Sequence, residues 1–142
     1  MIGITSKTVY AVAAIYQLGS LEGCKTLKIK DIAQKANVPQ KFLEQILLEL
    51  KKSGLLSSSK GAYGGYRLAK TLEKIKLKDI IEILENDTFA DVCKTGNETL
   101  KLFWCDIQAN LKNALDVPLS ELKKNEEKLN QILNFSIQRY LI

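Results

Sequence analysis

Four successive segments within the first 84 residues carry apolar side chains at the spacing i, i+3, i+4, i+7. This spacing puts the four side chains of a segment on one face of an α-helix, so each segment predicts a short amphipathic helix. The four faces are Val9, Val12, Ala13 and Tyr16; Ile29, Ile32, Ala33 and Ala36; Leu43, Ile46, Leu47 and Leu50; and Leu77, Ile80, Ile81 and Leu84. Such faces are buried by packing the helices against one another.

Only Asn37, Val38 and Pro39 separate the second predicted helix from the third. Proline suits the first turn of a helix, because the N–H that it lacks has no partner within the helix there. Two helices joined by so tight a turn predict a helix-turn-helix. The third helix is expected to end at Ser53 and Gly54, with the glycine in the left-handed conformation.

Two short extended runs, residues 55–60 and 66–70, flank a glycine-rich turn at residues 61–65. This pattern predicts a β-hairpin, and a hairpin directly after a helix-turn-helix is a wing. The predicted fold class is therefore mainly α with a small β-hairpin wing: a winged helix-turn-helix DNA-binding domain over residues 1–85, followed by a long dimerisation helix.

The apolar periodicity lapses over residues 86–97, which predicts a loop, here called the sensor-type loop. Residues 95–98 match a capping box that would start a helix. Residues 98–142 are predicted to hold the dimerisation helix and a helical tail packed on that helix or on the wing domain. The predicted dimer seam repeats at coiled-coil-like steps: Leu100, Trp104, Ile107, Leu111 and Ala114. The same stripe could instead cover the chain's own core.

Charge and composition limit the function. Residues 1–80 hold 14 Lys/Arg and six Asp/Glu, a net charge of +8, whereas residues 81–142 hold seven and ten, a net of −3. The basic half is the candidate for binding a polyanion. The chain has no histidine, which removes the usual general base and argues against an enzyme. Three widely spaced cysteines and the absence of a membrane-length apolar run favour a cytoplasmic location without membrane contact.

The second helix of a helix-turn-helix reads the major groove with its N-terminal residues. Its predicted outward side chains can pair with base edges or phosphate: Gln40, Lys41, Glu44, Gln45 and Lys51. In the wing, Lys60 supplies a cation for the minor groove, and the small residues Gly61, Gly64 and Gly65 would let the backbone approach the duplex. The alternative is that these polar side chains of the third helix form an ordinary solvent-exposed surface that binds no DNA.

Several stretches resemble the Rrf2 family of regulators: residues 30–33, 42–45, 50–55 and 59–68. The resemblance implies a dimeric winged-helix regulator in which Lys41, Glu44 and Gln45 read bases and the residue before Gly61 enters the minor groove. That residue is Lys60, where the family usually has arginine; lysine keeps the charge but lacks the planar fork. The predicted wing contacts also include Tyr63, Tyr66 and Arg67.

Cluster-binding members of that family carry three cysteines about six residues apart, completed by a histidine or an acidic ligand. This chain has Cys93 and Cys105 at the outer positions, Thr99 at the middle one and Gln108 at the fourth. An iron–sulfur cluster is not expected, because the middle cysteine and the histidine are missing. Three interpretations of the two cysteines stay open: cluster or metal ligands helped by oxygen donors, a redox thiol pair, or small packed hydrophobes.

These observations predict a dimeric, sequence-specific DNA-binding transcriptional regulator of the repressor type. Its double-stranded DNA site would be roughly palindromic, with half-sites about one helical turn, ~34 Å, apart or a small multiple of that distance. The alternative is a winged-helix protein-interaction module without a DNA target. The operator, the target genes and the effector are not encoded in any recognisable motif.

Overall fold

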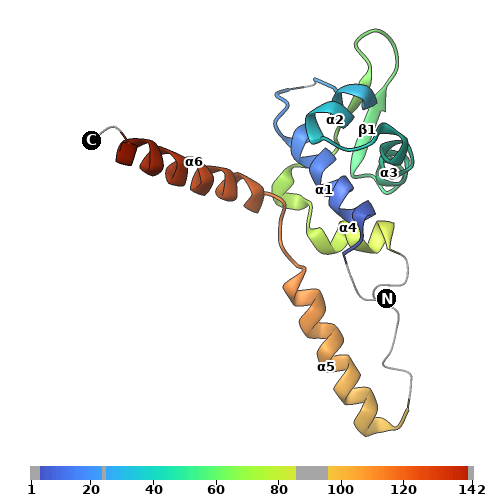
Figure 1. The fold of residues 1–142 in the computed structure, drawn as a ribbon. Coiled ribbons are helices and arrows are strands. Elements are labelled where there is room, and N and C mark those ends of the chain that lie inside the picture. The colour runs from blue at the N-terminus through green and yellow to red at the C-terminus, as the bar shows by residue number, and fades with distance from the viewer. Residues whose placement is uncertain (1–3, 24, 86–95, 141–142) are drawn as a thin grey trace.

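The computed structural model describes residues 4–23, 25–85 and 96–140, and these residues form helices and one two-stranded antiparallel sheet. The predicted class, mainly α with a small β-hairpin, is confirmed. In chain order the elements are α1 (Ser6–Gly19), α2 (Ile29–Ala36), α3 (Gln40–Lys52), β1 (Leu56–Ser59), β2 (Gly65–Leu68), the 3-10 helix η1 (Leu72–Lys74), α4 (Leu77–Leu84), α5 (Glu98–Ala114) and α6 (Glu121–Tyr140). Figure 1 shows helices α1 to α4 and the hairpin gathered in one body, from which α5 and α6 extend separately.

Three of the four predicted helix faces form the core of that body. Helix α3 buries all four of its predicted residues, and α4 buries Ile80, Ile81 and Leu84. On α2 only Ile32 is fully buried, while the other predicted residues pack at the edge of the core. Because burying one large aliphatic side chain contributes about 1.5–3 kcal/mol, these faces account for much of what holds the helices together.

The predicted face of α1 is wrong. The buried residues are Thr8, Ala11, Ala14, Ile15 and Leu18, whereas Val9 is 53% exposed. Helix α1 contacts α2, α3, α4 and β2, so it lies at the centre of the body and is covered from several sides. Its sequence is apolar almost throughout, and two overlapping stripes therefore fit a helical period. The stripe with two alanines faces inward, where small side chains let neighbouring elements come close.

The turn between α2 and α3 is held by backbone geometry. Asn37 adopts the left-handed conformation, with φ 54° and ψ 49°, and its N–H donates to the carbonyls of Ala33 and Gln34. Pro39 is the N-cap of α3, one residue earlier than the predicted first-turn position. At the other end of α3, Gly54 has φ +86° and the N–H of Leu55 donates to the carbonyl of Leu50, which confirms the predicted glycine cap.

The hairpin pairs β1 with β2 in antiparallel register, from Leu56 opposite Leu68 to Ser59 opposite Gly65. The segment before α2 adds a bridge to it: Tyr66 N–H donates to the Leu27 carbonyl at 2.7 Å, and Leu27 N–H donates back at 2.9 Å. These two bonds attach the wing to the start of the helix-turn-helix. Strand β1 is one residue shorter at each end than the predicted run 55–60, whereas β2 begins one residue earlier and ends two residues earlier than the predicted run 66–70.

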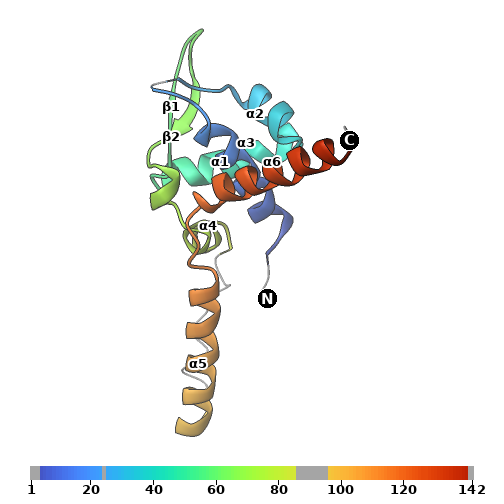
Figure 2. The ribbon, with the colours of Figure 1, turned by 90° about the vertical axis from the view of Figure 1, so that its left-hand side faces the viewer.

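Helix α5 extends away from the body in both views (Figures 1 and 2) and buries none of its side chains. Its N-cap is Asn97, whose side-chain oxygen accepts a hydrogen bond from the Leu100 N–H at 3.0 Å. The predicted capping box from Thr95 to Glu98 is therefore wrong, and Thr95 itself lies outside the described residues. The sequence alone could not decide between Thr95 and Asn97 as the N-cap, because threonine and asparagine are both favoured at this position.

The expectation that the tail packs on α5 or on the wing domain is wrong for most of α6. Leu122 packs against the core near the start of the helix, and the Tyr16 hydroxyl donates to Glu126 at 2.7 Å. Beyond that contact the large apolar side chains are at least half exposed: Leu129, Ile132, Leu133, Phe135, Ile137 and Tyr140. Helix α6 buries no side chain.

The turn between α5 and α6 is joined to the body by a set of backbone hydrogen bonds, here called the joint. Leu77 N–H donates to the Val117 carbonyl, Lys78 N–H to the Leu115 carbonyl, and Leu119 N–H to the Ile75 carbonyl, at 2.8–2.9 Å. Lys76 also forms an ion pair with Asp116 at 2.8 Å. The joint fixes one end of each C-terminal helix to the segment that leads into α4.

Most of the predicted sensor-type loop, residues 86–95 with Cys93, lies outside the described residues, and so does Cys24. Among the helices that the structure describes, none combines the length and the apolar character needed to cross a bilayer.

Candidate nucleic-acid interface

The five predicted contact residues on α3 lie on its exposed surface: Gln40, Lys41, Glu44, Gln45 and Lys51. The same helix turns Leu43, Ile46, Leu47 and Leu50 into the core. Because α3 starts at Gln40, its first two turns carry four of the five exposed side chains. This is the end of a recognition helix that meets base edges in the major groove.

Helix α1 steadies the exposed side of α3 through two contacts. The rings of Tyr10 and Phe42 have centroids 6.0 Å apart, and the Lys7 ammonium lies 3.0 Å from a carboxylate oxygen of Glu49. Gln45 Nε2 donates to the same oxygen at 3.1 Å. Sequence reasoning missed Lys7 and Glu49. The i, i+4 spacing of Gln45 and Glu49 was a usable signal, but Lys7 lies 42 positions from Glu49 and had none.

At the wing tip, Lys60, Gly61 and Tyr63 are all exposed, and Tyr63 is 96% exposed. Gly61 has φ +100° with open space around it, so its conformation alone requires glycine there. The hydroxyl of Thr26 donates to the Tyr63 carbonyl at 2.8 Å and ties the tip to the segment before α2. The tip thus presents a cation and an aromatic ring on a tethered turn.

The other two wing glycines have reasons inside the protein. A Cβ at Gly64 would lie 2.4 Å from the Ser59 carbonyl oxygen, and a Cβ at Gly65 would lie 2.4 Å from the Leu27 carbonyl oxygen. Tyr66 is half-buried and packs against the core. These three predicted contact residues therefore build and anchor the wing. Close packing inside the protein is enough to explain why Gly64 and Gly65 are glycines.

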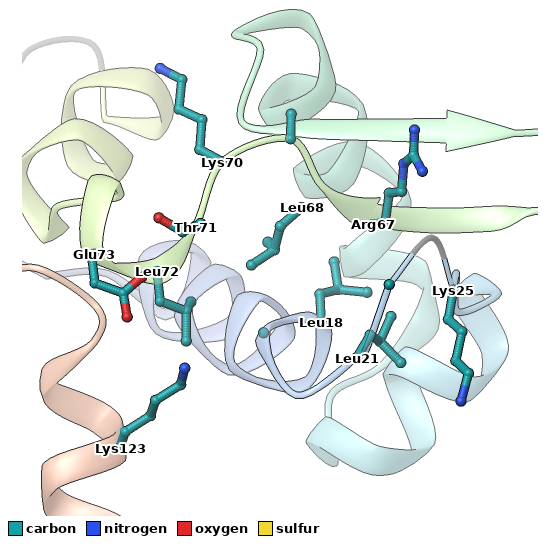
Figure 3. Close-up of a pocket in the computed structure, with 13 residues that line it drawn as sticks. Leu18, Leu21, Lys25, Arg67, Leu68, Lys70, Thr71, Leu72, Glu73 and Lys123 are labelled. Atoms are coloured by element: carbon teal, nitrogen blue, oxygen red, sulfur yellow. The ribbon is translucent and has the colours of Figure 1, made fainter.

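Arg67 lies on β2 opposite Ser57, and its Nε donates to the Ser57 hydroxyl at 3.1 Å. A pocket of about 310 Å³ lies at the base of the wing, with an apolar floor that includes Leu18, Leu68 and Leu72. Figure 3 shows the charged ends of Arg67 and Lys70 pointing away from that floor. Their charges therefore do not converge on a ligand position in the pocket, and the Arg67 guanidinium stays on the outer surface of the hairpin.

A groove of about 590 Å³ separates the wing tip from the segment that leads into α2, and Lys25 and Lys28 line it beside Tyr63. These two lysines were not among the predicted contacts, although they contribute to the net charge of residues 1–80. Together with Lys60 they surround the tip with positive charge, which attracts a phosphate backbone.

The predicted sensor residues divide between described and undescribed parts of the chain. Cys105 lies on α5 and is disulfide-bonded, while Cys93 lies outside the described residues. Within the described ranges no three His, Cys, Asp or Glu side chains gather as a metal site would require. Cluster ligands are thiolates, so a disulfide-bonded Cys105, together with Thr99 at the middle position, does not fit the cysteine set of an iron–sulfur centre.

The predicted dimer seam is accessible along α5. Leu100 is 47% and Trp104 41% exposed, Ile107 and Leu111 are half-buried, and Ala114 is exposed. The alternative that this stripe covers the chain's own core is wrong, because α5 buries no side chain. Phe103, missed by the seam pattern, packs edge-on against Trp104 with ring centroids 5.0 Å apart.

Comparison with known proteins gives one consistent family. Residues 4–125 match the Rrf2 family model, described as iron-dependent transcriptional regulators. The chain is 32% identical over 114 residues to the HTH-type transcriptional regulator CymR of Bacillus subtilis, across 80% of this chain and 83% of that protein. It is 30% identical over 135 residues to the HTH-type transcriptional regulator IscR of Escherichia coli, across 89% and 83%.

Solved structures give the same result. The structure of B. subtilis CymR, described as the global cysteine regulator of that organism, superposes with a TM-score of 0.74 at 31% identity, across 88% of this chain and 98% of that one. The oxidized form of Staphylococcus aureus CymR superposes with a TM-score of 0.66 at 30% identity, across 85% and 95%. The relatives of this chain are transcriptional regulators and not enzymes. The chain belongs to the Rrf2 family of winged-helix, DNA-binding transcriptional regulators.

Proposed function

We propose that this regulator is a homodimeric, sequence-specific repressor in which residues 1–85 bind double-stranded DNA and residues 98–142 join two copies. The observation that carries the proposal is the exposed polar face of α3 beside a wing tipped by Lys60. A dimer covering a palindromic promoter site would exclude polymerase from the same DNA. Since its partner is chromosomal DNA, we place the protein in the cytoplasm.

The proposed contacts follow from the chemistry of the exposed groups. In the major groove, Lys41 donates to guanine or phosphate, Glu44 accepts from the cytosine amine, and Gln45 reads an adjacent base. Gln40 and Lys51 extend this face along α3. In the minor groove the Lys60 ammonium enters the negative potential, with Gly61, Tyr63 and Arg67 on the flanking phosphates.

The second copy is proposed from the apolar surface of α5. Trp104, Leu100 and the ring of Phe103 form an exposed apolar stripe on a helix that buries none of its side chains among the described residues. Burying aromatic side chains of this kind at the centre of an interface supplies most of its affinity. Two copies joined along α5 would place two recognition helices on successive half-sites.

The DNA claim is tested by selecting duplexes from a random library with the full chain and measuring affinity by fluorescence anisotropy. Replacing Lys60, or Lys41 together with Gln45, by alanine should weaken binding by about 1–3 kcal/mol per contact and flatten the salt dependence by about one phosphate per lysine. Lys74→Ala, an exposed lysine on η1, is the control. Unchanged affinity at matched salt would favour the protein-interaction module instead.

We further propose that thiol oxidation tunes DNA binding. The disulfide at Cys105 supports this, and so does the existence of an oxidized form of S. aureus CymR. DNA affinity should differ between protein treated with dithiothreitol and protein treated with diamide, and Cys105→Ser should remove the difference. Thr99→Ser, at an exposed position on the same helix, is the control. An identical response in the Cys105 variant would rule the proposal out.

A further inference from the structure

Gln45, on the proposed base-reading face, is the outer member of a chain of polar contacts between two helices. Its Nε2 donates to Glu49 Oε1 at 3.1 Å, one turn further along α3. The same oxygen accepts from the Lys7 ammonium of α1 at 3.0 Å. The Lys7 and Glu49 side chains are 37% and 25% exposed, so this pair lies at the edge of the surface while Gln45 is exposed.

The protonation state of Glu49 decides how the Gln45 amide is turned. Partial burial raises the pKa of Glu49, but hydrogen bonds from Gln45 and Lys7 and the charges of Lys7 and Lys52 outweigh it, so the pKa is lower than usual. The carboxyl group is therefore ionised at neutral pH, and an ionised carboxylate only accepts hydrogen bonds. The amide nitrogen must face Glu49, because the amide oxygen would face a like partial charge.

A glutamine amide without such a neighbour can turn over and offer either its oxygen or its nitrogen to a base. Adenine and cytosine present exocyclic amine donors in the major groove, whereas guanine and thymine present carbonyl acceptors. With the nitrogen held toward Glu49, the oxygen is the group left for the groove. Its natural partner is a base that donates.

From this geometry we infer that Glu49, held by Lys7, is a specificity-determining residue that orients Gln45 to read adenine or cytosine and to discriminate against guanine and thymine. The inference rests on the proposed DNA binding and deepens it. Glu49 acts through Gln45 and touches no base, so it is a positioning residue. Its removal should change which base is preferred, with little change in how tightly the rest of the site is held.

The test uses the full-length chain and the duplex selected from the random library. Affinities are measured for the selected duplex and for its single-base-pair variants, first with Gln45→Ala to find the base pair at which preference depends on Gln45. The wild-type protein should prefer adenine or cytosine there, on the strand facing α3, by about tenfold. Glu49→Gln should reduce that preference severalfold, because the new amide can donate to Gln45 as well as accept from it.

Two further variants sharpen the readout. Glu49→Lys supplies a donor in place of the acceptor, so the Gln45 oxygen should turn inward and the preference should move toward guanine or thymine. Glu82→Gln, an exposed carboxylate on α4, is the matched control and should leave all preferences unchanged. Thermal melting followed by circular dichroism checks that each variant is folded.

The outcomes separate this inference from the proposal beneath it. Selective DNA binding in which Glu49→Gln keeps the preference that Gln45→Ala loses would overturn the inference alone. The same holds if the wild type prefers guanine or thymine at the Gln45 position, or if Gln45→Ala changes no preference. A library that yields no enriched sequence would overturn the proposed function together with the inference.

Discussion

The two halves of this chain use apolar residues in opposite ways. Among the described residues, every buried hydrophobic side chain but one lies between Ala11 and Leu84, and the exception, Leu119, belongs to the joint. Helices α5 and α6, with 17 and 20 residues, bury none of their side chains. The first half therefore has a core of its own, whereas the described helices of the second half leave most of their apolar side chains accessible.

The difference is one of packing, because apolar residues are present in both halves. Leu100, Phe103 and Trp104 on α5 are 41–54% exposed, comparable with Leu129 and Ile132 on α6. An isolated helix of this length is marginal in water, since its propensity alone hardly offsets the entropy of ordering it. A second copy that covers these stripes would therefore stabilise the helices as well as join the subunits.

The largest expected effect comes from Leu47, which is fully buried on α3. Leu47→Ala should lower the free energy of unfolding by about 2–5 kcal/mol, because it leaves a cavity in the core. Urea denaturation followed by circular dichroism, at two protein concentrations, measures it. The matched substitution Leu133→Ala on α6, where the side chain is 50% exposed, should leave the unfolding of the first half unchanged. Equal losses in the two variants would contradict the comparison.

The second effect concerns association. Trp104→Ala should raise the dimer dissociation constant by about thirtyfold or more, as expected for an aromatic residue at an interface centre. Sedimentation equilibrium measures the constant. Leu102 is 68% exposed and lies on the opposite face of α5, so Leu102→Ala should have little effect. A wild-type protein that stays monomeric at high concentration would contradict the proposal that two copies associate along α5.

The smallest effect is expected at the joint between the halves. The hydrogen bond from Lys76, assisted by its charge, lowers the pKa of Asp116, and Asp116 raises the pKa of Lys76. The lowered pKa means that Asp116 contributes stability at neutral pH and loses it as the pH falls through its folded value. The raised pKa of Lys76 means that this lysine contributes stability at neutral pH and that the contribution is lost as the pH rises through the pKa of Lys76 in the folded protein.

Asp116→Asn should therefore be slightly less stable than the wild type at neutral pH. The two proteins should converge in acid, once the aspartate of the wild type is protonated. Because the two side chains are 41% and 34% exposed, water screens the pair, and the small effect is best followed as a difference between two melting curves. A gap that persists unchanged in acid would show that the charge of Asp116 is not its source.

The sequence predicted the recognition helix well and its surroundings poorly, for identifiable reasons. On α3 only the stripe of Leu43, Ile46, Leu47 and Leu50 repeats at the helical period, and most of the other positions are polar, although Phe42 and Leu48 lie exposed among them. On α1 the apolar residues fit two stripes, and only the arrangement of α2, α3, α4 and β2 around the helix selects Ala11, Ala14 and Ile15 over Val9.

The candidate site shows the same limit. The exposed side chains of α3 and the cation at the wing tip follow from helical period and turn composition. The internal roles of Gly64 and Gly65 do not, because they depend on backbone from Ser59 and Leu27 coming within contact distance. Nor could Lys7 be predicted as a neighbour of Glu49, since only the packing of α1 on α3 brings them together.

Because the joint attaches α5 at one end, a small tilt of this helix would become a larger movement at its other end. With 17 residues the helix is about 25 Å long, and one end is bonded to the backbone at residues 75–78. If the helix tilted by about 5° about this attached end, its other end would move by about 2 Å. Three backbone hydrogen bonds hold the near end, so a movement of α5 would act first on residues 75–78, which connect η1 to α4.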